Sequence, residues 1–191
     1  MKIKMCLLSD MIFGSGLSLP GGVDILIQTD EHGFPFYKGS TFKGVFREAL
    51  EQYLAWTDPD DKKKSEKTLK TLLGIGGDKQ INNPRKLIFS DFVLSMNVRG
   101  AVLDEGLSQV AVRELFTNSR TFTKVQDEGT VADGSLRTAH CINKNLWFYS
   151  EIACAAEDEK LIEDVLGTIK WIGTMRSRGF GNVLIEREEE R

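Results

Sequence analysis

The sequence has few of the residues that build disulfide frameworks or metal sites. Its 191 residues include three cysteines and two histidines. Because Cys6, Cys141 and Cys154 are odd in number and far apart, we expect neither a disulfide framework nor a CxxC metal knuckle, and we interpret them as small buried hydrophobic residues. With only His32 and His140 available, we expect no zinc site either.

The chain also lacks long hydrophobic runs. No stretch approaches the roughly 20 apolar residues of a membrane span, and the N-terminus has none of the regions of a secretory signal peptide. We therefore expect a cytoplasmic protein without a membrane partner. A content of 41% hydrophobic and 28% charged residues is that of a globular chain that buries one sizeable core. This predicts a single domain over residues 1–191.

An excess of positive charge is missing as well. The formal net charge of −3 argues against a protein that coats duplex DNA by bulk electrostatics. It does not exclude a focused cationic groove, because part of the acidity is local. Four glutamates crowd residues 186–190, whereas Arg176 and Arg178 have no acidic neighbour nearby in the sequence.

Hydrophobic patterning predicts four strands in the body of the domain. Residues 1–8 alternate apolar and polar side chains, as a half-buried strand does. Residues 87–96 and 146–154 are apolar runs rich in β-forming residues, which we interpret as two central strands. A last short strand is expected over residues 180–185.

Two helices are expected between these strands. Apolar residues at three- and four-residue steps predict a helix that is capped by Ser40 or Thr41 and ends near Trp56. A second helix is predicted over residues 157–172, with acidic residues in its first turn and Gly173 as its stop signal.

The elements then follow the order β-α-β, an insert, and β-α-β again. This order predicts an α+β fold of the ferredoxin-like, RNA-recognition-motif-like split βαβ type. The insert covers about residues 97–145 and contains a short helix near 110–116. Residues 121–125 and 130–138 can pair as a hairpin arm that projects from the domain.

Two segments are candidates for binding phosphate. In the first, residues 37–47 (YKGSTFKGVFR), cations sit at the start of a helix, where a cation is disfavoured unless an anion binds there. An exposed helix with ordinary surface cations is the alternative. The candidate residues of this segment are Lys38, Gly39, Ser40, Lys43 and Arg47.

The second segment is residues 173–181 (GTMRSRGFG). Glycines allow successive backbone N–H groups to converge on one anion, and arginines add charge and forked donors. The glycines follow a helix and precede a strand, which is the reverse of a dinucleotide-binding fold. A glycine-rich turn with surface arginines is the alternative. The candidate residues are Gly173, Arg176, Ser177, Arg178, Gly179 and Gly181.

These segments carry a family resemblance. Residues 34–47 (FPFYKGSTFKGVFR) resemble the lPyipGSslKGalR motif of the RAMP superfamily of CRISPR-associated proteins. Residues 173–181 resemble its C-terminal GGxrSRGfG loop. Leu73-Gly74 followed by residues 87–94 (LIFSDFVL) is similar to its lFG…lxfsDa strand. The segments occur in the family's order and span most of the chain.

The resemblance implies a prokaryotic domain that binds CRISPR RNA within a multisubunit effector complex, most like the repeated backbone subunit of type III complexes. Its implied partners are single-stranded guide RNA, target RNA and other effector subunits. Head-to-tail copies of the chain follow from a backbone role. In that group the helix cations, here Lys43 and Arg47, and the glycine-rich loop hold the guide backbone. A hairpin thumb, here Arg120 and residues 121–137, displaces a nucleotide at regular intervals.

The resemblance also implies a cleaving residue. Asp24, in the sequence GGVD, falls where the family has a loop aspartate that cuts target RNA. One carboxylate can accept the proton of a 2′-hydroxyl or hold a divalent cation such as Mg²⁺. The chain would then be an endoribonuclease acting within a complex in antiviral defence. A loop aspartate that hydrogen-bonds its own turn is the common alternative.

Other functions stay open. A guide-processing or capping subunit of the same superfamily would be expected to use a general base such as His32, although residues 30–33 are more typical of a hairpin turn. A structural RNA-binding assembly protein would lack nuclease activity, and a small-nucleotide binder would use the two glycine-rich segments. The chain departs from the family pattern at Lys38, often a proline, and at Thr174, which replaces a glycine. It is also short for a backbone subunit.

Overall fold

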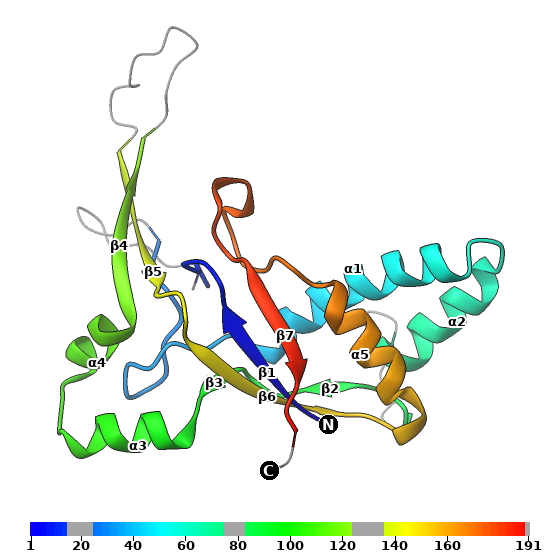
Figure 1. The fold of residues 1–191 in the computed structure, drawn as a ribbon, viewed down its shortest axis with the longest axis horizontal. Coiled ribbons are helices and arrows are strands. Elements are labelled where there is room, and N and C mark those ends of the chain that lie inside the picture. The colour runs from blue at the N-terminus through cyan, green and yellow to red at the C-terminus, as the bar shows by residue number, and fades with distance from the viewer. Residues whose placement is uncertain (15–24, 75–82, 124–135, 190–191) are drawn as a thin grey trace, which may run out of the picture.

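The computed structural model describes residues 1–14, 25–74, 83–123 and 136–189, which form an antiparallel sheet, several helices and a projecting hairpin (Figure 1). The strands of the sheet are β1 (Lys2–Leu7), β2 (Ile88–Phe89), β3 (Val93–Leu94), β6 (Trp147–Ala153) and β7 (Val183–Arg187). β1 lies between β6 and β7, while β2 and β3 both pair with β6, and every pair is antiparallel. Two β-α-β halves are thus interleaved, which is consistent with the predicted ferredoxin-like α+β fold.

Two helices, α1 (Gly39–Thr57) and α5 (Glu159–Thr168), pack on one face of this sheet. The other described helices are α2 (Lys62–Leu73), α3 (Met96–Asp104) and α4 (Gln109–Phe116), with short 3₁₀ turns η1 (Ala156–Asp158) and η2 (Arg176–Arg178). α1 contacts both α2 and α5, and α5 also contacts β7. No helix in the described ranges is long and apolar enough to cross a membrane.

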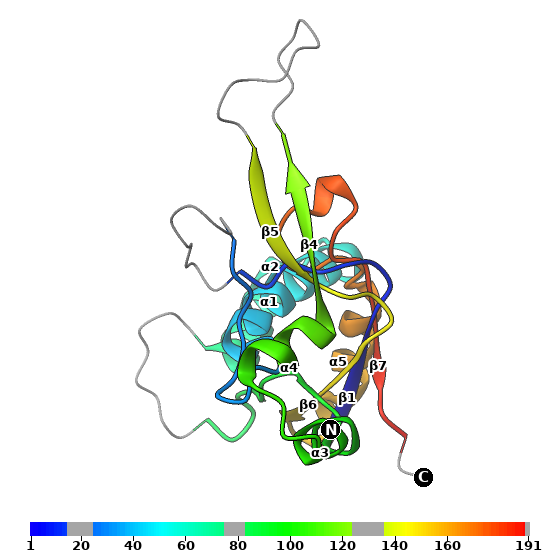
Figure 2. The same cartoon turned by 90° about the vertical axis from the view of Figure 1, so that its left-hand side faces the viewer.

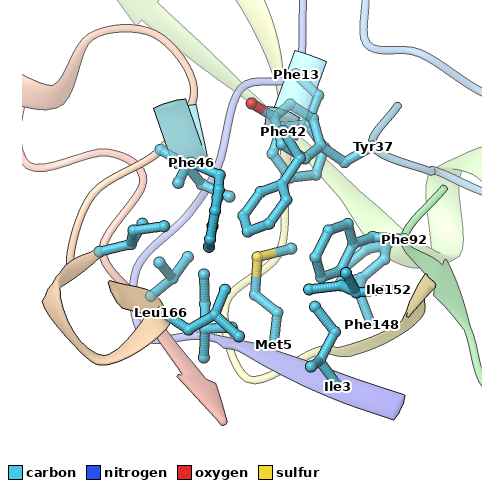
Figure 3. Close-up of a cluster of buried hydrophobic side chains, with 14 of the residues drawn as sticks. Ile3, Met5, Phe13, Tyr37, Phe42, Phe46, Phe92, Phe148, Ile152 and Leu166 are labelled. Atoms are coloured by element: carbon cyan, nitrogen blue, oxygen red, sulfur yellow. The ribbon is translucent and has the colours of Figure 1, made fainter. Parts of the chain in front are cut away.

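The core lies between the sheet and these two helices. Ile3, Met5 and Leu7 of β1 are fully buried, whereas Lys2 and Lys4, which alternate with them, lie on the other face. Figure 3 shows how side chains of α1, α5, β1 and β6 meet in this layer. Burying each such side chain contributes roughly 2 kcal/mol, so this layer fixes where α1 begins relative to the sheet.

The insert forms a separate two-stranded sheet. β4 (Thr117–Phe122) pairs with β5 (Arg137–Ile142) over six residue pairs. The hairpin projects from the domain in both views (Figures 1 and 2). A projecting hairpin was predicted from the sequence, but the pairing begins at Thr117, closer to the body of the domain. Most of the predicted arm, residues 124–135, lies outside the described residues.

Three local predictions are wrong. Residues 87–96 are not a central strand: they form only β2 and β3, both paired with one side of β6. The N-cap of α1 is Lys38, without a side-chain hydrogen bond, so neither Ser40 nor Thr41 caps this helix. α5 ends at Thr168, because the residues after it pair with the start of the last strand, as in the hydrogen bond from Ile172 N to Gly181 O at 2.9 Å.

Candidate RNA-binding surface

The glycine-rich loop closes a short antiparallel pairing ahead of β7. Gly173 and Gly181 adopt positive φ angles of 77° and 84°. A Cβ atom on Gly181 would lie 2.0 Å from Ile172 O, so this position requires glycine for packing. These two glycines fix the base of the loop, and the exposed residues Arg176, Ser177 and Arg178 form its outer part.

The loop is bound to the segment that follows β1. Gly181 N donates to Asp10 O at 3.0 Å, and Thr174 N donates to Ile12 O at 3.3 Å. A Cβ atom on Gly173 would lie 2.9 Å from the same Ile12 oxygen. The position of the two loop arginines is therefore set by backbone contacts at the base of the loop.

A pocket of about 260 Å³ separates this loop from α1. Thr41, Val45 and Glu48 line it from the helix, and Gly173 and Arg176 line it from the loop. The guanidinium of Arg176 can donate hydrogen bonds to a ligand, and the carboxylate of Glu48 can accept them from a ligand. The pocket thus offers a ligand both a cation and a carboxylate.

Tyr37 forms the floor of this pocket. Its ring stacks on Phe13 with centroids 4.2 Å apart, and the residue is 5% exposed. Burial raises the pKa of the Tyr37 hydroxyl to about 12, with smaller opposing effects from Arg176 and Glu48. The hydroxyl therefore lies on the pocket side, near both charges. Among the described residues it has no hydrogen-bond partner, so it can donate to a ligand.

Lys43 and Arg47 lie on another flank of α1. Each follows a pocket residue, Thr41 or Val45, by two positions, which is a rotation of about 200° around the helix. Arg47 Nη2 donates to Gly74 O at 3.0 Å and to Leu73 O at 3.5 Å, at the C-terminus of α2. Of these three cations, Arg176 lines the pocket between the loop and α1, whereas Lys43 and Arg47 do not.

The start of α1 is already engaged by the protein. Gly39 N donates to Asp91 Oδ1 at 2.8 Å. A Cβ atom on Gly39 would lie 2.3 Å from Phe89 O, so glycine lets the helix start against β2. Lys38 and Ser40 on either side are exposed. A phosphate at this helix end would therefore meet side chains, since the N–H group of Gly39 is in use.

Arg120 lies at the base of the hairpin. Its Nη2 is 2.8 Å from Asp10 Oδ2, while Asp10 Oδ1 accepts a hydrogen bond from Lys144 N at 3.1 Å. Burial pushes the pKa of Asp10 upward, but the hydrogen bonds from Arg120, Lys144 N and Asn118 outweigh this and lower it. Asp10 is thus an anionic anchor that ties β4 to the segment after β1.

The hairpin also contacts the glycine-rich loop. The Phe122 and Phe180 rings meet edge to face with centroids 5.6 Å apart. The Arg178 guanidinium lies over the Phe122 ring, 5.5 Å from its centroid. The thumb and the loop, to which the resemblance assigned RNA binding, therefore contact each other through Phe122, Arg178 and Phe180.

Asp24 lies outside the described residues. Ile25, which follows it, pairs with Ala139 of β5, and His140 N donates to Ile25 O at 3.0 Å. His32 lies in a turn, with Nε2 3.6 Å from Glu31 Oε1. Asp30 holds that turn by accepting a hydrogen bond from His32 N at 2.9 Å. The described residues contain no group of three or more acidic, cysteine or histidine side chains that could hold a metal.

Sequence reasoning missed three residues of this surface, namely Asp10, Phe13 and Tyr37 as a pocket residue. Most of their contacts join segments far apart in the chain, such as Asp10 and Arg120, which are separated by 110 positions. The one local signal was Tyr37, which stands at the start of the first phosphate-binding segment.

The comparisons with known proteins agree with this architecture. A chain of the type III-B Cmr-beta complex bound to cognate target RNA superposes with a TM-score of 0.68 at 13% identity, covering 97% of this chain and 95% of that one. A chain of the same complex in its apo state gives 0.64 at 14% identity, with the same coverage. At these identities the likeness establishes a shared fold. No curated protein matches the sequence.

The sequence also matches a family model. The model described as the RAMP superfamily matches residues 4–184. That range includes most of β1, both candidate phosphate-binding segments, the hairpin and the start of β7. The chain therefore belongs to the RAMP superfamily.

Proposed function

We propose that this chain is an RNA-binding subunit of a type III CRISPR effector complex, acting in the prokaryotic cytoplasm in antiviral defence. The observation that carries the proposal is the likeness, over 97% of this chain and 95% of the other, to a chain solved in a type III-B complex with cognate target RNA. Because the likeness covers both chains almost completely, the proposal concerns the whole domain, including its hairpin and glycine-rich loop.

The guide RNA would be held through its backbone. Arg176 and Arg178 are exposed at the outer part of the loop, and Lys43 and Arg47 lie half-buried on α1. Arginine and lysine side chains bind phosphates without reading sequence, so specificity would come from base pairing between guide and target. Arg120, paired with Asp10, would orient the hairpin and reach RNA only with its remaining donors.

A backbone role requires contacts between successive copies of the chain. The helices of the insert offer a surface for them, because α3 has no buried residue. Met96 is 77% exposed and Leu115 of α4 is 54% exposed. Exposed apolar residues on these two consecutive helices can be buried against another protein chain. A heterologous contact through this surface would build the open, head-to-tail assembly that a long guide needs.

Cleavage of the target would use Asp24. A carboxylate can accept the proton of a ribose 2′-hydroxyl as the 2′-oxygen attacks the adjacent phosphorus. The bond between phosphorus and the 5′-oxygen then breaks, the 5′-oxygen takes a proton from water, and a 2′,3′-cyclic phosphate remains. The residue that follows Asp24 in the sequence, Ile25, pairs with Ala139 of β5. This cleavage route uses the carboxylate alone, so the dependence of cleavage on Mg²⁺ is measured separately.

The proposal is tested with the assembled complex, guide RNA and a complementary target. Asp24→Ala is expected to lower the cleavage rate by about 100-fold or more, while complex assembly and target binding stay unchanged. Asp60→Ala, an exposed aspartate in the loop between α1 and α2, is the matched control. Both variants are assayed with Mg²⁺ and with a chelator. Unchanged cleavage by Asp24→Ala would move the chemistry to another residue and favour a structural assembly role.

A guide-processing role makes a different prediction. It requires the isolated chain to cut repeat RNA at one site without a target strand, and to lose that activity in His32→Ala. The side chain of His32 is 48% exposed and contacts Glu31 in the turn. This contact belongs to the turn and does not form a binding site for a substrate. Site-specific cutting by the lone chain would contradict the backbone proposal.

A further inference from the structure

Three cations gather where α1 passes the end of α2. The Arg47 guanidinium reaches the carbonyl oxygen of Gly74 at 3.0 Å. Lys86 lies beside the same glycine: a Cβ atom on Gly74 would be 3.6 Å from Lys86 Cε and 3.8 Å from its Nζ. Lys43 precedes Arg47 by one turn of the helix. All three residues are half-buried.

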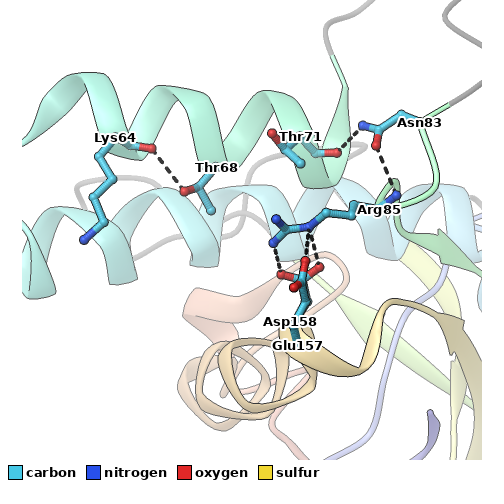
Figure 4. A network of polar contacts seen from close by, with 7 residues as sticks. All are labelled: Lys64, Thr68, Thr71, Asn83, Arg85, Glu157 and Asp158. Atoms are coloured by element: carbon cyan, nitrogen blue, oxygen red, sulfur yellow. Dashed lines mark hydrogen bonds and ion pairs between the residues drawn. The ribbon is translucent and has the colours of Figure 1, made fainter.

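Lys86 is held in this place by its neighbours. Figure 4 shows Asn83 bound to α2 and Arg85 bound to Glu157 and Asp158 of η1. Asn83 Nδ2 donates to Thr71 O at 2.6 Å, and Arg85 Nε donates to Asp158 Oδ2 at 3.1 Å. Lys86 N in turn donates to Asn83 O at 3.1 Å. The backbone of Lys86 is thereby fixed against the last turn of α2.

Within the part of the chain that the structure describes, no ion pair balances the charges of this cluster. None of the three cations has a carboxylate partner among the described residues. Burial lowers the pKa of Lys43, and the positive charges of Lys86 and then of Arg47 lower it further. Lys86 thus acts on Lys43 more strongly than Arg47 does, although Arg47 is on the same helix. Like charges in a half-buried place repel one another unless an anion binds between them.

We infer that Lys43, Arg47 and Lys86 together form a phosphate-binding site, in which Lys86 is a third cation contributed from outside the α1 segment. The inference rests on the proposed function, because the phosphate would belong to RNA. Arg47 uses only one of its nitrogens on α2, so its guanidinium keeps donors for a phosphate oxygen. The two lysines supply charge from the sides.

A purely structural role is the competing explanation. Cations near a helix C-terminus bind its last carbonyl groups and favour its dipole, as Arg47 does at Leu73 and Gly74. If Lys86 served the helix alone, its loss would lower the melting temperature and leave RNA binding unchanged. The two explanations therefore predict changes in different quantities: the melting temperature for a role in the helix, and the RNA affinity for phosphate binding.

The experiment compares Lys86→Gln with Lys63→Gln, an exposed lysine in the first turn of α2. Affinity for a single-stranded RNA is measured by fluorescence anisotropy over a salt series. One lost phosphate contact lowers the magnitude of the slope of log K against log salt by about 0.7 and the affinity by about five-fold at 0.1 M salt. Lys86→Gln should show this change, Lys86→Arg should restore the slope, and Lys63→Gln should match the unmodified chain.

The outcomes separate the inference from the function on which it rests. If the unmodified chain binds RNA and Lys86→Gln binds it with the same slope, the inference is overturned and the proposed function stands. A lower melting temperature with unchanged RNA affinity also overturns it, in favour of helix capping. If inorganic phosphate saturates the cluster while RNA length has no effect on the unmodified chain, RNA is not the ligand and the proposed function fails.

Discussion

The Oδ1 atom of Asp91 accepts a hydrogen bond from the backbone N–H of Gly39 at 2.8 Å. Asp91 lies in the LIFSDFVL segment and Gly39 in the first phosphate-binding segment, so two of the family-like motifs meet at one contact. The carboxylate does what an N-cap side chain does, but from 52 positions away. It fixes the start of α1 and therefore the direction in which Lys43 and Arg47 leave the helix.

Removing this cap should destabilise the protein without touching a charged RNA contact. Asp91→Ala is expected to lower the free energy of unfolding by about 1 kcal/mol, as the loss of a helix cap does. Urea denaturation measures the difference. Asp91→Asn keeps an acceptor oxygen and should lose less. Equal stability of the alanine variant and the unmodified chain would show that the contact does not hold α1.

Tyr37→Phe should separate stability from RNA binding. The Tyr37 hydroxyl has no hydrogen-bond partner among the described residues, so its removal should change the free energy of unfolding by less than about 1 kcal/mol. If RNA enters the pocket beside Arg176, the same change should weaken RNA binding several-fold. Anisotropy titration and urea denaturation of one preparation give both values. A variant that is less stable and binds RNA normally would contradict this role.

The Asp10 anchor should make stability depend on pH in the acid range. The pKa of Asp10 in the folded protein lies below its ordinary value, because the hydrogen bonds from Arg120, Lys144 N and Asn118 outweigh burial. A lowered folded pKa stabilises the protein above the unfolded pKa, near 3.9, and this contribution is lost as pH falls through the folded pKa. Urea denaturation at several pH values should show a weaker acid dependence in Asp10→Asn. An identical pH profile would exclude the anchor as its source.

The contact between Arg178 and Phe122 should appear as an energetic coupling. Arg178→Ala, Phe122→Ala and the double variant complete a double-mutant cycle in which the coupling free energy should be about 0.5–1 kcal/mol. Thermal or urea denaturation supplies the four stabilities. Strict additivity would mean that the hairpin and the glycine-rich loop touch without stabilising each other.

The exposed apolar residues of the insert should be needed for assembly rather than for folding. Met96→Glu and Leu115→Glu are expected to reduce the size of guide-bound assemblies, as light scattering after gel filtration can show, because a charge in an apolar contact is costly to bury. The melting temperatures should stay within about 2 °C of the unmodified chain, since both side chains are exposed. Assemblies of normal size would place the interface elsewhere.

Local patterns predicted much of the body of this fold. β1, α1, β6 and α4 lie close to where periodicity placed them, because each presents a regular apolar face to one core. The errors occur where long-range pairing decides the structure. Residues 87–96 are divided into two short strands by the segment that turns Asp91 toward Gly39. α5 ends early because Ile172 pairs with Gly181.

The site was harder to predict than the fold. The sequence indicates that Arg47 is cationic, but not that the C-terminus of α2 accepts its hydrogen bonds. It also cannot show that Arg120 meets Asp10, or that Lys86 joins Lys43. Such contacts depend on how separate elements pack, so local motifs predicted residue types better than residue partners.

We propose that this chain binds the backbone of single-stranded RNA. The affinity of the chain for RNAs of increasing length is the measurement that decides this. We predict that affinity rises with strand length, and that log K falls linearly with log salt with a slope of about −0.7 for each phosphate contacted. Base composition should matter little. Saturable micromolar binding of a mononucleotide that longer strands do not improve would contradict the account and favour a small-nucleotide binder.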